Sequence, residues 1–340
     1  MDLHRCILAG TTSQDPENAL IATDLKSAPA PLYRDPLEDG AADPVLVYNP
    51  HEQAWWMIYT NRPTTVRHAE GISWLFGSKL GVASSTDGCA TWRYRGTLEG
   101  LDFEWGHNTF WAPEIFEHNG IFHMYVSYIR GIPLGCADDE MLIHHYTSNN
   151  LIAWDHHGPI ALSSNNVIDA CIIQLPEGGF RMWYKDQVHD SETWAADSDN
   201  LYDWTVRGRV LSTPGGHEGP NVFFHQGFYW LIVDSWSGQL AFRSLDLDHW
   251  APAGKILTGS VGDEHARADD EGPGLHADVV VDGDDAWIFY FTHPERTEKD
   301  HPTERSRRSS IQVAQLDVED GDLVCNRDQV PLPAIGAPSP

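Results

Sequence analysis

The sequence predicts an all-β protein, because its apolar runs are short, aromatic and β-branched, and turn residues separate them. No run of ten or more residues carries a convincing helical period of 3.6. A unit of four strands recurs five times along the 340 residues. Units of roughly 50–65 residues have the length of a propeller blade. We therefore predict a five-bladed β-propeller with four-stranded antiparallel blades, and the alternative is a pair of β-sandwiches.

The first half of each predicted unit is a strand, a turn and a strand rich in aromatic residues. These pairs are 43–48 with 55–59, 112–116 with 122–126, 169–173 with 180–184, 217–224 with 229–232, and 276–280 with 287–291. In a propeller the first strand of each unit lines the central channel, so all five strands begin at the same mouth of that channel.

The second half of the first four units carries a polar turn, followed by a Trp and then a Gly. The four tryptophans are Trp92, Trp154, Trp204 and Trp250. Asp and Asn suit such turns because they tolerate left-handed backbone and bond to nearby amides. We expect each Trp to cover the sheet of its own unit. The histidine pairs 144–145 and 156–157 fall on outer strands, so we expect them at the surface.

The composition excludes several classes of function. The formal charge is −28, from 50 acidic and 22 basic residues. Nucleic-acid binding needs a cationic surface, so neither nucleic acid nor an anionic membrane is an expected partner. The first residues lack a basic segment followed by a long apolar run, which predicts no signal peptide, no membrane span and a cytoplasmic location. Residues 1–35 form a polar lead-in that could mediate a homo-oligomer, and residues 36–335 form the propeller.

Acidic residues recur where the channel-lining strands begin. The five entry points carry Asp43, the step Ala112-Pro113-Glu114, Asp169, Glu218 and His276. Turn preference alone explains one such Asp, but not several carboxylates at equivalent points of one ring. Hydrolysis of a glycosidic bond needs one protonated carboxyl as acid and one ionised carboxylate as base or nucleophile. A third carboxylate can raise the pKa of the acid. A Ca²⁺ site is the rival interpretation, and both can hold in one channel.

These segments resemble glycoside hydrolase family 43 and its five-bladed relatives. The matching pieces follow the order of the chain over about residues 36–325: Asp43 with its neighbours, Trp111 to Ile115, Ile168-Asp169, Glu218-Gly219-Pro220, and the step from Gly274 to His276. Two departures are the Asp-Ala at 169, where Asp-Pro is more usual, and an extra Leu275. The segment Tyr33-Arg34-Asp35-Pro36 is similar to a motif of fructan-cleaving relatives, but it precedes the first blade, so we treat it as chance.

The resemblance implies a role for each site residue. Asp43 would be the general base that activates water, Glu218 the general acid, and Asp169 the residue that tunes the pKa of the acid. His276 resembles a histidine at the channel axis that binds substrate and often lies by a structural Ca²⁺. The chemistry itself requires no cofactor.

Two further residues are candidates for binding the substrate. Trp111 could stack on a sugar face, although a core role fits it about as well. Arg308 is the nearest match to an arginine with which relatives touch the substrate.

The sequence therefore favours an inverting, exo-acting glycosidase that removes terminal arabinofuranosyl, xylosyl or related units from oligosaccharides. A second enzyme hypothesis is a hydrolase of anhydro-sugars, such as neoagaro-oligosaccharides, whose acid can be a histidine. The rival from another class is a carbohydrate-binding propeller without turnover, which would need aromatic platforms but no converging carboxylates.

Overall fold

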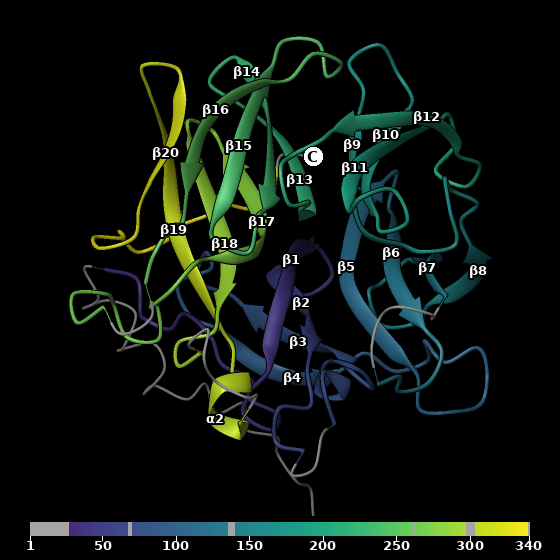
Figure 1. The fold of residues 1–340 in the computed structure, drawn as a ribbon, viewed down its shortest axis with the longest axis horizontal. Helices are drawn as coiled ribbons and strands as arrows, with labels where there is room; N and C mark the ends of the chain where they lie inside the picture. Colours follow the sequence, from purple (N-terminus) through teal and green to yellow (C-terminus); the bar gives the residue numbers. More distant parts are fainter. Residues whose placement is uncertain (1–26, 67–69, 135–139, 261–262, 297–302, 339–340) are drawn as a thin grey trace, which may run out of the picture.

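The chain folds into five antiparallel sheets arranged in a ring, as Figure 1 shows. The computed structural model describes residues 27–66, 70–134, 140–260, 263–296 and 303–338. Each sheet contains four strands that follow one another in the chain. The predicted five-bladed propeller with four-stranded antiparallel blades is confirmed, and the sandwich alternative is wrong.

The five blades are named in chain order. Blade 1 contains β1 (Ala41–Asn49), β2 (Ala54–Asn61), β3 (Lys79–Ser85) and β4 (Arg93–Thr97). Blade 2 contains β5 (Thr109–His118), β6 (Ile121–Ile129), β7 (Met141–Ser148) and β8 (Asp155–Pro159). Blade 3 contains β9 (Val167–Gln174), β10 (Phe180–Asp186), β11 (Glu192–Ser198) and β12 (Thr205–Leu211). Blade 4 contains β13 (Glu218–His225), β14 (Phe228–Asp234), β15 (Gln239–Ser244) and β16 (Ala251–Ile256). Blade 5 contains β17 (Leu275–Asp282), β18 (Asp285–Thr292), β19 (Ser310–Glu319) and β20 (Asp322–Asn326).

Helix is scarce among the described residues. It is limited there to η1 (Ser73–Leu75) and α2 (Glu304–Arg307), which begins with a capping box between Thr303 and Ser306. Neither of these described helices has the length and apolar character needed to cross a membrane. α2 lies on the face viewed in Figure 1, beside the start of blade 1.

The second strand of each blade carries the core. Every residue of β2 and of β10 is buried, because neighbouring blades cover both faces of these strands. Trp183 and Trp230 are fully buried. Burying one such side chain removes about 150–250 Å² from water and contributes roughly 4–6 kcal/mol before the loss of entropy.

The polar turn found in the sequence connects the third and fourth strands of the first four blades. In blade 3, the Ser198 hydroxyl accepts hydrogen bonds from the backbone of Asn200 (3.2 Å) and Leu201 (2.9 Å). Leu201 has a positive φ of 67° and is buried. The Trp that follows packs on the core of its own blade, as we expected, and it also reaches the preceding blade. The Trp204 ring lies 5.7 Å from Tyr125 of blade 2, and Trp250 lies 6.4 Å from Trp183 of blade 3. Each of these rings seals the interface with the preceding blade.

The predicted surface position is wrong for His144 and His145, which are 4% and 1% exposed. Both lie on β7, which neighbouring blades cover on both faces. His144 Nδ1 is 2.9 Å from Nε2 of the exposed His156. Burial, helped by neighbouring histidines, lowers the pKa of His144 to about 4 and of His145 to about 3, so both rings are neutral at physiological pH.

The ring closes without exchange of a terminal strand, since β17 packs directly on β1. Both ends of the described chain cross this junction. On one side, the Tyr33 backbone exchanges hydrogen bonds of 3.1 and 2.9 Å with Ile311 of β19 before the chain enters blade 1. On the other, the chain leaving blade 5 bonds to blade 1 through Ile335 and Gly88 (3.1 Å). Of the predicted lead-in, residues 1–26 lie outside the described residues, and with them most of the segment expected to reach a partner.

Asp35 anchors the segment that enters blade 1. Its carboxylate accepts hydrogen bonds from the Tyr59 hydroxyl (2.6 Å) and the Asn61 amide (2.9 Å), and the Tyr59 hydroxyl also contacts that of Tyr33 (2.8 Å). It accepts further hydrogen bonds from the backbone of Leu37 and Glu38. Asp35 is 2% exposed. The Arg-Asp-Pro segment is therefore a structural element of this fold.

Replacing Asp35 by Ala should lower the free energy of unfolding by about 1–3 kcal/mol, because it leaves buried donors without an acceptor. Urea denaturation measures the change. Asp155→Ala removes an exposed carboxylate from β8 and serves as the control, with an expected change within about 0.5 kcal/mol. Equal stability of the two variants would show that the Asp35 network does not hold this segment.

Candidate active site

A β-bulge interrupts each channel-lining strand near its entry. The register with the second strand shifts at Ala42/Val45 in blade 1, Trp111/Glu114 in blade 2, Trp183/Lys185 in blade 3, Glu218/Asn221 in blade 4 and Leu275/Ala277 in blade 5. Asp43, Ala112 and Asp169 have positive φ values of 46°, 42° and 60°, and Gly219 has 56°. A bulge turns the local side chain away from its regular direction. The residues predicted from strand entries therefore lie at one kinked level of the channel.

Side chains of the second strands hold these bulges from the preceding blade. The Thr60 hydroxyl accepts from the Ala112 backbone (2.8 Å), the Ser127 hydroxyl from the Asp169 backbone (3.1 Å), and the Asp234 carboxylate from the His276 backbone (2.9 Å). Within their own blades, Thr60, Ser127 and Asp234 each pair with the residue just before the bulge. The same position in blade 3 is Lys185, opposite Ile168.

Lys185 is a donor where the other blades have an acceptor. Its ammonium donates to Glu218 Oε2 at 2.9 Å. The backbone N–H of Gly219 donates instead to Asp169 Oδ2, at 3.0 Å. This exchange of partners brings Asp169 next to the segment that carries Glu218.

A neighbouring arginine holds the Asp43 side chain in place. Nη2 of Arg62 lies 3.2 Å from both carboxylate oxygens, and the Asp43 side chain is 8% exposed. The Arg62 guanidinium lies over the Phe291 ring, 4.7 Å from its centroid. Nδ1 of His276 is 3.8 Å from Asp43 Oδ1. Asp43 therefore lies between a fixed cation and an imidazole.

Glu218 is the most solvent-accessible of the three acidic residues, with 29% of its side chain exposed. The Trp236 indole donates to Oε1 at 2.8 Å, while Lys185 occupies Oε2. Burial would raise the pKa of Glu218, but the Lys185 charge, its hydrogen bond and that of Trp236 outweigh burial and lower the pKa. Glu218 is thus ionised in the free protein at neutral pH.

Asp169 and Asp234 have the opposite tendency. Burial, with a contribution from the Glu218 charge, raises the pKa of Asp169 to about 6, although the His276 ring opposes the shift. Burial and the Glu218 charge raise the pKa of Asp234 well above its ordinary value. Carboxyls with divergent pKa values in one site are the condition for combined acid and base chemistry.

His276 lies between the strands that carry Asp43 and Glu218. Besides its approach to Asp43, its ring packs on Gly219, where an added Cβ would lie 2.7 Å from the His276 Cγ. Across the described ranges, no group of three or more His, Cys, Asp or Glu side chains is arranged to hold a metal ion. Ca²⁺ takes six to eight oxygen ligands. The side chains around His276 do not supply the ligands that such an ion needs. The Ca²⁺ expected from the resemblance therefore stays a prediction.

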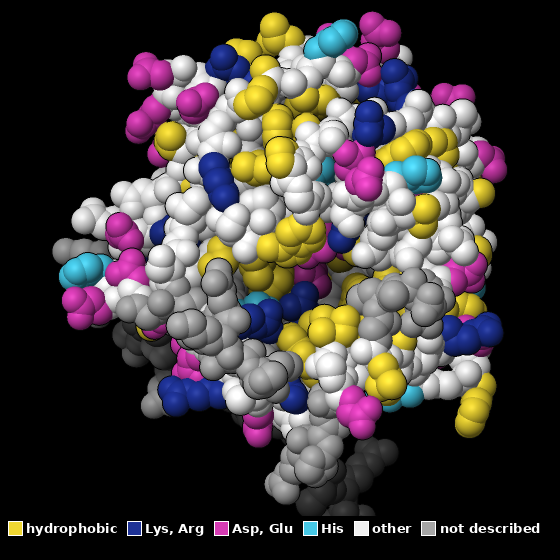
Figure 2. All heavy atoms as spheres, viewed as in Figure 1, with side chains coloured by type: hydrophobic (Ala, Val, Ile, Leu, Met, Phe, Trp, Pro, Cys, Tyr) yellow, Lys and Arg dark blue, Asp and Glu magenta, His cyan; other side chains and the backbone are white. Residues whose placement is uncertain are grey.

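Figure 2 shows a hollow near the middle of the face that carries α2, where acidic, basic and histidine atoms lie between hydrophobic ones. Further along the axis, a cavity of about 260 Å³ is lined by Glu114, Asp278, Asn221 and apolar residues. Burial and the Asp278 charge raise the pKa of Glu114 to about 8. Glu114, the acidic residue of the second entry, therefore belongs to the inner channel and is largely uncharged at neutral pH.

The two further residues predicted to bind the substrate, Trp111 and Arg308, have different surroundings in the structure. Trp111 is half-buried at the level of the bulges, its indole donates to the Leu75 carbonyl (2.8 Å), and its ring packs on Phe76. Arg308 lies among the carboxylates of Asp39, Asp269 and Glu295, at 2.9, 3.4 and 3.4 Å. A guanidinium with three acidic partners is poorly placed to bind sugar, and a role for Arg308 at the substrate stays a prediction.

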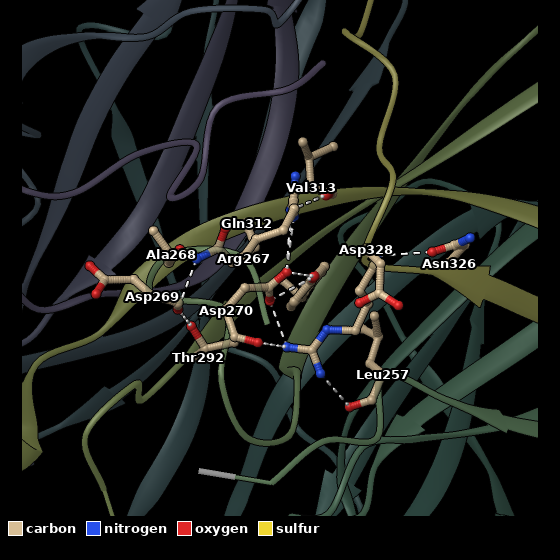
Figure 3. Close-up of polar contacts among 12 residues, drawn as sticks. Leu257, Arg267, Ala268, Asp269, Asp270, Thr292, Gln312, Val313, Asn326 and Asp328 are labelled. Atoms are coloured by element: carbon tan, nitrogen blue, oxygen red, sulfur yellow. Dashed lines mark hydrogen bonds and ion pairs between the residues drawn. The ribbon is translucent and has the colours of Figure 1, made fainter. Parts of the chain in front are cut away.

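Hydrogen bonds hold the loop that leads into β17, as Figure 3 shows. Asp270 accepts hydrogen bonds from the Tyr290 hydroxyl (2.9 Å) and from Arg327 (2.6 Å). The carbonyl of Asp269 accepts from Gln312 (2.8 Å) and Thr292 (2.6 Å). Tyr290 and Thr292 of β18 and Gln312 of β19 thus hold the loop before β17 in place.

Sequence reasoning missed Lys185, Trp236 and Asp234, and it placed Arg62 in a loop that could cover the channel mouth without giving it a role. A signal for two of them was present, because Thr60, Ser127, Lys185 and Asp234 all lie in the last three residues of the aromatic strand of their unit. A lysine where blades 1, 2 and 4 have hydroxyl or carboxyl groups marks blade 3 as different. Trp236 and Arg62 lie just beyond these strands, and only the fold shows that they turn back to the channel.

Comparison with known proteins agrees with this arrangement. The family model described as glycosyl hydrolases family 43 matches residues 80–237, which span parts of blades 1 to 4. No curated protein sequence matches the chain.

Solved structures share the whole ring. A thermostable family-43 glycoside hydrolase is 19% identical, with a TM-score of 0.65 over 88% of this chain and 99% of that one. CoXyl43, a β-xylosidase/α-arabinofuranosidase from a compost microbial metagenome, is 14% identical, with a TM-score of 0.65 over 88% and 96%. The GH43_1 enzyme from Xanthomonas citri, complexed with xylose, is 17% identical, with a TM-score of 0.64 over 90% and 95%. Such identities establish the fold alone, and the family model makes residues 80–237, less than half of the chain, similar to glycosyl hydrolases family 43.

Proposed function

We propose that the chain is an inverting, exo-acting glycosidase that removes terminal xylosyl, arabinofuranosyl or related units from oligosaccharides. The observation that carries the proposal is the gathering of Asp43, Asp169, Glu218 and His276 at one mouth of the channel. The solved relatives include an enzyme complexed with xylose and a β-xylosidase/α-arabinofuranosidase in complex with xylotriose, which supports a pentose at this site.

In this mechanism Asp43 accepts a proton from water while the water oxygen attacks the anomeric carbon. Glu218 donates a proton to the glycosidic oxygen, and the bond to the leaving sugar breaks. The ion pair with Arg62 supports the base role, because it fixes the orientation of the Asp43 carboxylate. The His276 ring, which approaches Asp43 and packs on Gly219, supports a separation that leaves room for water.

The acid must be protonated before it can act. Glu218 is ionised in the free protein, so it has to gain its proton as the substrate binds. Asp169, with a pKa raised to about 6 and a hydrogen bond to the Gly219 backbone, is the neighbouring carboxyl that can share that proton. Lys185 opposes this protonation and therefore sets the pH range of activity.

Glu218→Gln should lower kcat/KM by about 10²- to 10⁴-fold, which is the usual contribution of a general acid. Glu114→Gln is the matched control, because it changes a buried carboxyl near a strand entry that is already largely uncharged at neutral pH. Circular dichroism checks that both variants fold. If Glu218→Gln retained full activity, the acid role would pass to a histidine such as His276, as in the anhydro-sugar hypothesis.

Lys185→Met should move the basic limb of the pH profile of kcat/KM to higher pH. The Lys185 charge lowers the pKa of Glu218, so its removal raises that pKa and keeps the acid protonated at higher pH. Arg95→Met, which removes a cation paired with Glu52 on the outside of blade 1, should leave the profile unchanged. An unshifted profile for Lys185→Met would mean that Glu218 is not the titrating acid.

A panel of aryl arabinofuranosides, xylosides and galactosides, with both anomers of each, tests the reaction itself. We expect release of the aryl alcohol from at least one pentoside, and NMR should detect the inverted anomer first. Saturable binding without release across the panel would instead support the carbohydrate-binding propeller. First formation of the retained anomer would contradict the inverting mechanism.

A further inference from the structure

A second charged cluster adjoins the base side of the hollow, and Arg62 is the member that it shares with the proposed reaction. It consists of Arg62, His293, Trp74 and Arg296, which we call the arginine pair site. Nη1 of Arg62 lies 3.3 Å from Nε2 of His293. The His293 ring packs edge-on against Trp74, at 6.3 Å, and the Arg296 guanidinium lies over the Trp74 ring at 5.0 Å. The cluster thus connects Asp43, through Arg62, to Arg296.

His293 contributes no positive charge to the cluster. Its Nδ1 is 2.7 Å from the Arg308 carbonyl, which can only accept, so Nδ1 carries the proton. Nε2 is then free to accept from Arg62. Burial, with the charges of Arg296 and Arg62, lowers the pKa of His293 well below its ordinary value, in agreement with a neutral ring.

Arg296 has no acidic partner among the residues that the structure describes. Its Nε donates to the Ser306 carbonyl (3.0 Å), and Nη2 is buried without a hydrogen-bond partner. No salt bridge joins Arg296 to a carboxylate in the part of the chain that the structure describes. Burial and the neighbouring Arg62 charge lower the pKa of Arg296 to about 9, so it remains a cation at neutral pH. With Asp43 balancing Arg62, the arginine pair site has one positive charge that no carboxylate of the described residues balances.

Burying a cation without a counterion costs free energy. The aromatic rings under both guanidiniums hold them in place through cation–π contacts. Because the overall charge is −28, a fixed positive site at the hollow differs from the acidic character of the protein as a whole. Guanidinium groups match planar carboxylates through paired hydrogen bonds. We propose that the arginine pair site binds a carboxylate on the sugar that lies over Asp43, so that the preferred terminal unit is a uronosyl residue.

This inference rests on the proposed glycosidase function and names the substrate class of the same site. The sugar attacked by the water on Asp43 must lie against Asp43, and Arg62 touches that carboxylate directly. A glucuronosyl unit is a xylosyl ring with a carboxylate on C5. A galacturonosyl unit has the same relation to arabinopyranose. The proposed substrate thus keeps the pentose ring and adds only the anion that Arg296 lacks.

The test compares aryl glycosides in pairs that differ by this carboxylate: xyloside with glucuronide, and arabinopyranoside with galacturonide, in both anomers. The wild type should have the higher kcat/KM for the uronide of at least one pair. Arg296→Met should lower the ratio of uronide to pentoside kcat/KM by about 10- to 100-fold, the effect of losing a charged hydrogen bond. Arg305→Met removes an exposed cation from nearby α2 and should leave the ratio unchanged.

Inhibition of the wild type by free glucuronate and xylose needs no variant, and glucuronate should bind at least tenfold more tightly. Cleavage of pentosides with rejection of uronides would overturn the acidic substrate and leave the proposed glycosidase intact. An unchanged ratio in a folded Arg296→Met variant would also overturn it. If neither class is cleaved, the glycosidase fails, and calorimetry with glucuronate on the wild type still decides whether the site binds a carboxylate.

Discussion

The active site depends on one kind of hydrogen bond between blades. In it, a side chain on the second strand of one blade accepts from the backbone at the bulge of the next blade. A bulge frees a backbone N–H that the regular ladder would have used, and a buried N–H needs an acceptor. Thr60, Ser127 and Asp234 supply that acceptor to the following blade. The entry residues of blades 2, 3 and 5 are therefore positioned by the preceding blade.

The interface between blades 3 and 4 departs from this pattern, and it is where the proposed acid lies. Lys185 cannot accept a hydrogen bond, so the Gly219 N–H takes its acceptor from Asp169. One substitution in a repeat thus places a cation on Glu218 and binds Asp169 to the same turn. The lowered pKa of Glu218 follows from that change of partner, while burial raises the pKa of Asp169.

The sequence was sufficient for the repeat, the number of blades and the four entry residues, because turn chemistry and strand periodicity are local. It was insufficient wherever two blades meet. The repeated tryptophans also pack on the preceding blade, and His144 and His145 are buried, since a blade has a neighbour on both faces. Arg62 and Trp236 reach the channel only through loops that follow the strands, and local patterns carry no information on where such loops turn. Arg308 illustrates the same limit, because its three carboxylate partners come from distant segments.

The junction between the last and first blades has a consequence for how this molecule tolerates damage to its ends. Many closed rings are locked by a strand borrowed from the other terminus, whereas here short backbone bridges at Tyr33 and Ile335 span the boundary. Asp43 and His276 belong to the two blades that meet there, 3.8 Å apart. Proteolytic trimming at either end would thus loosen the boundary that brings these two side chains together, and hydrolytic competence would decline before the remaining blades lost their order.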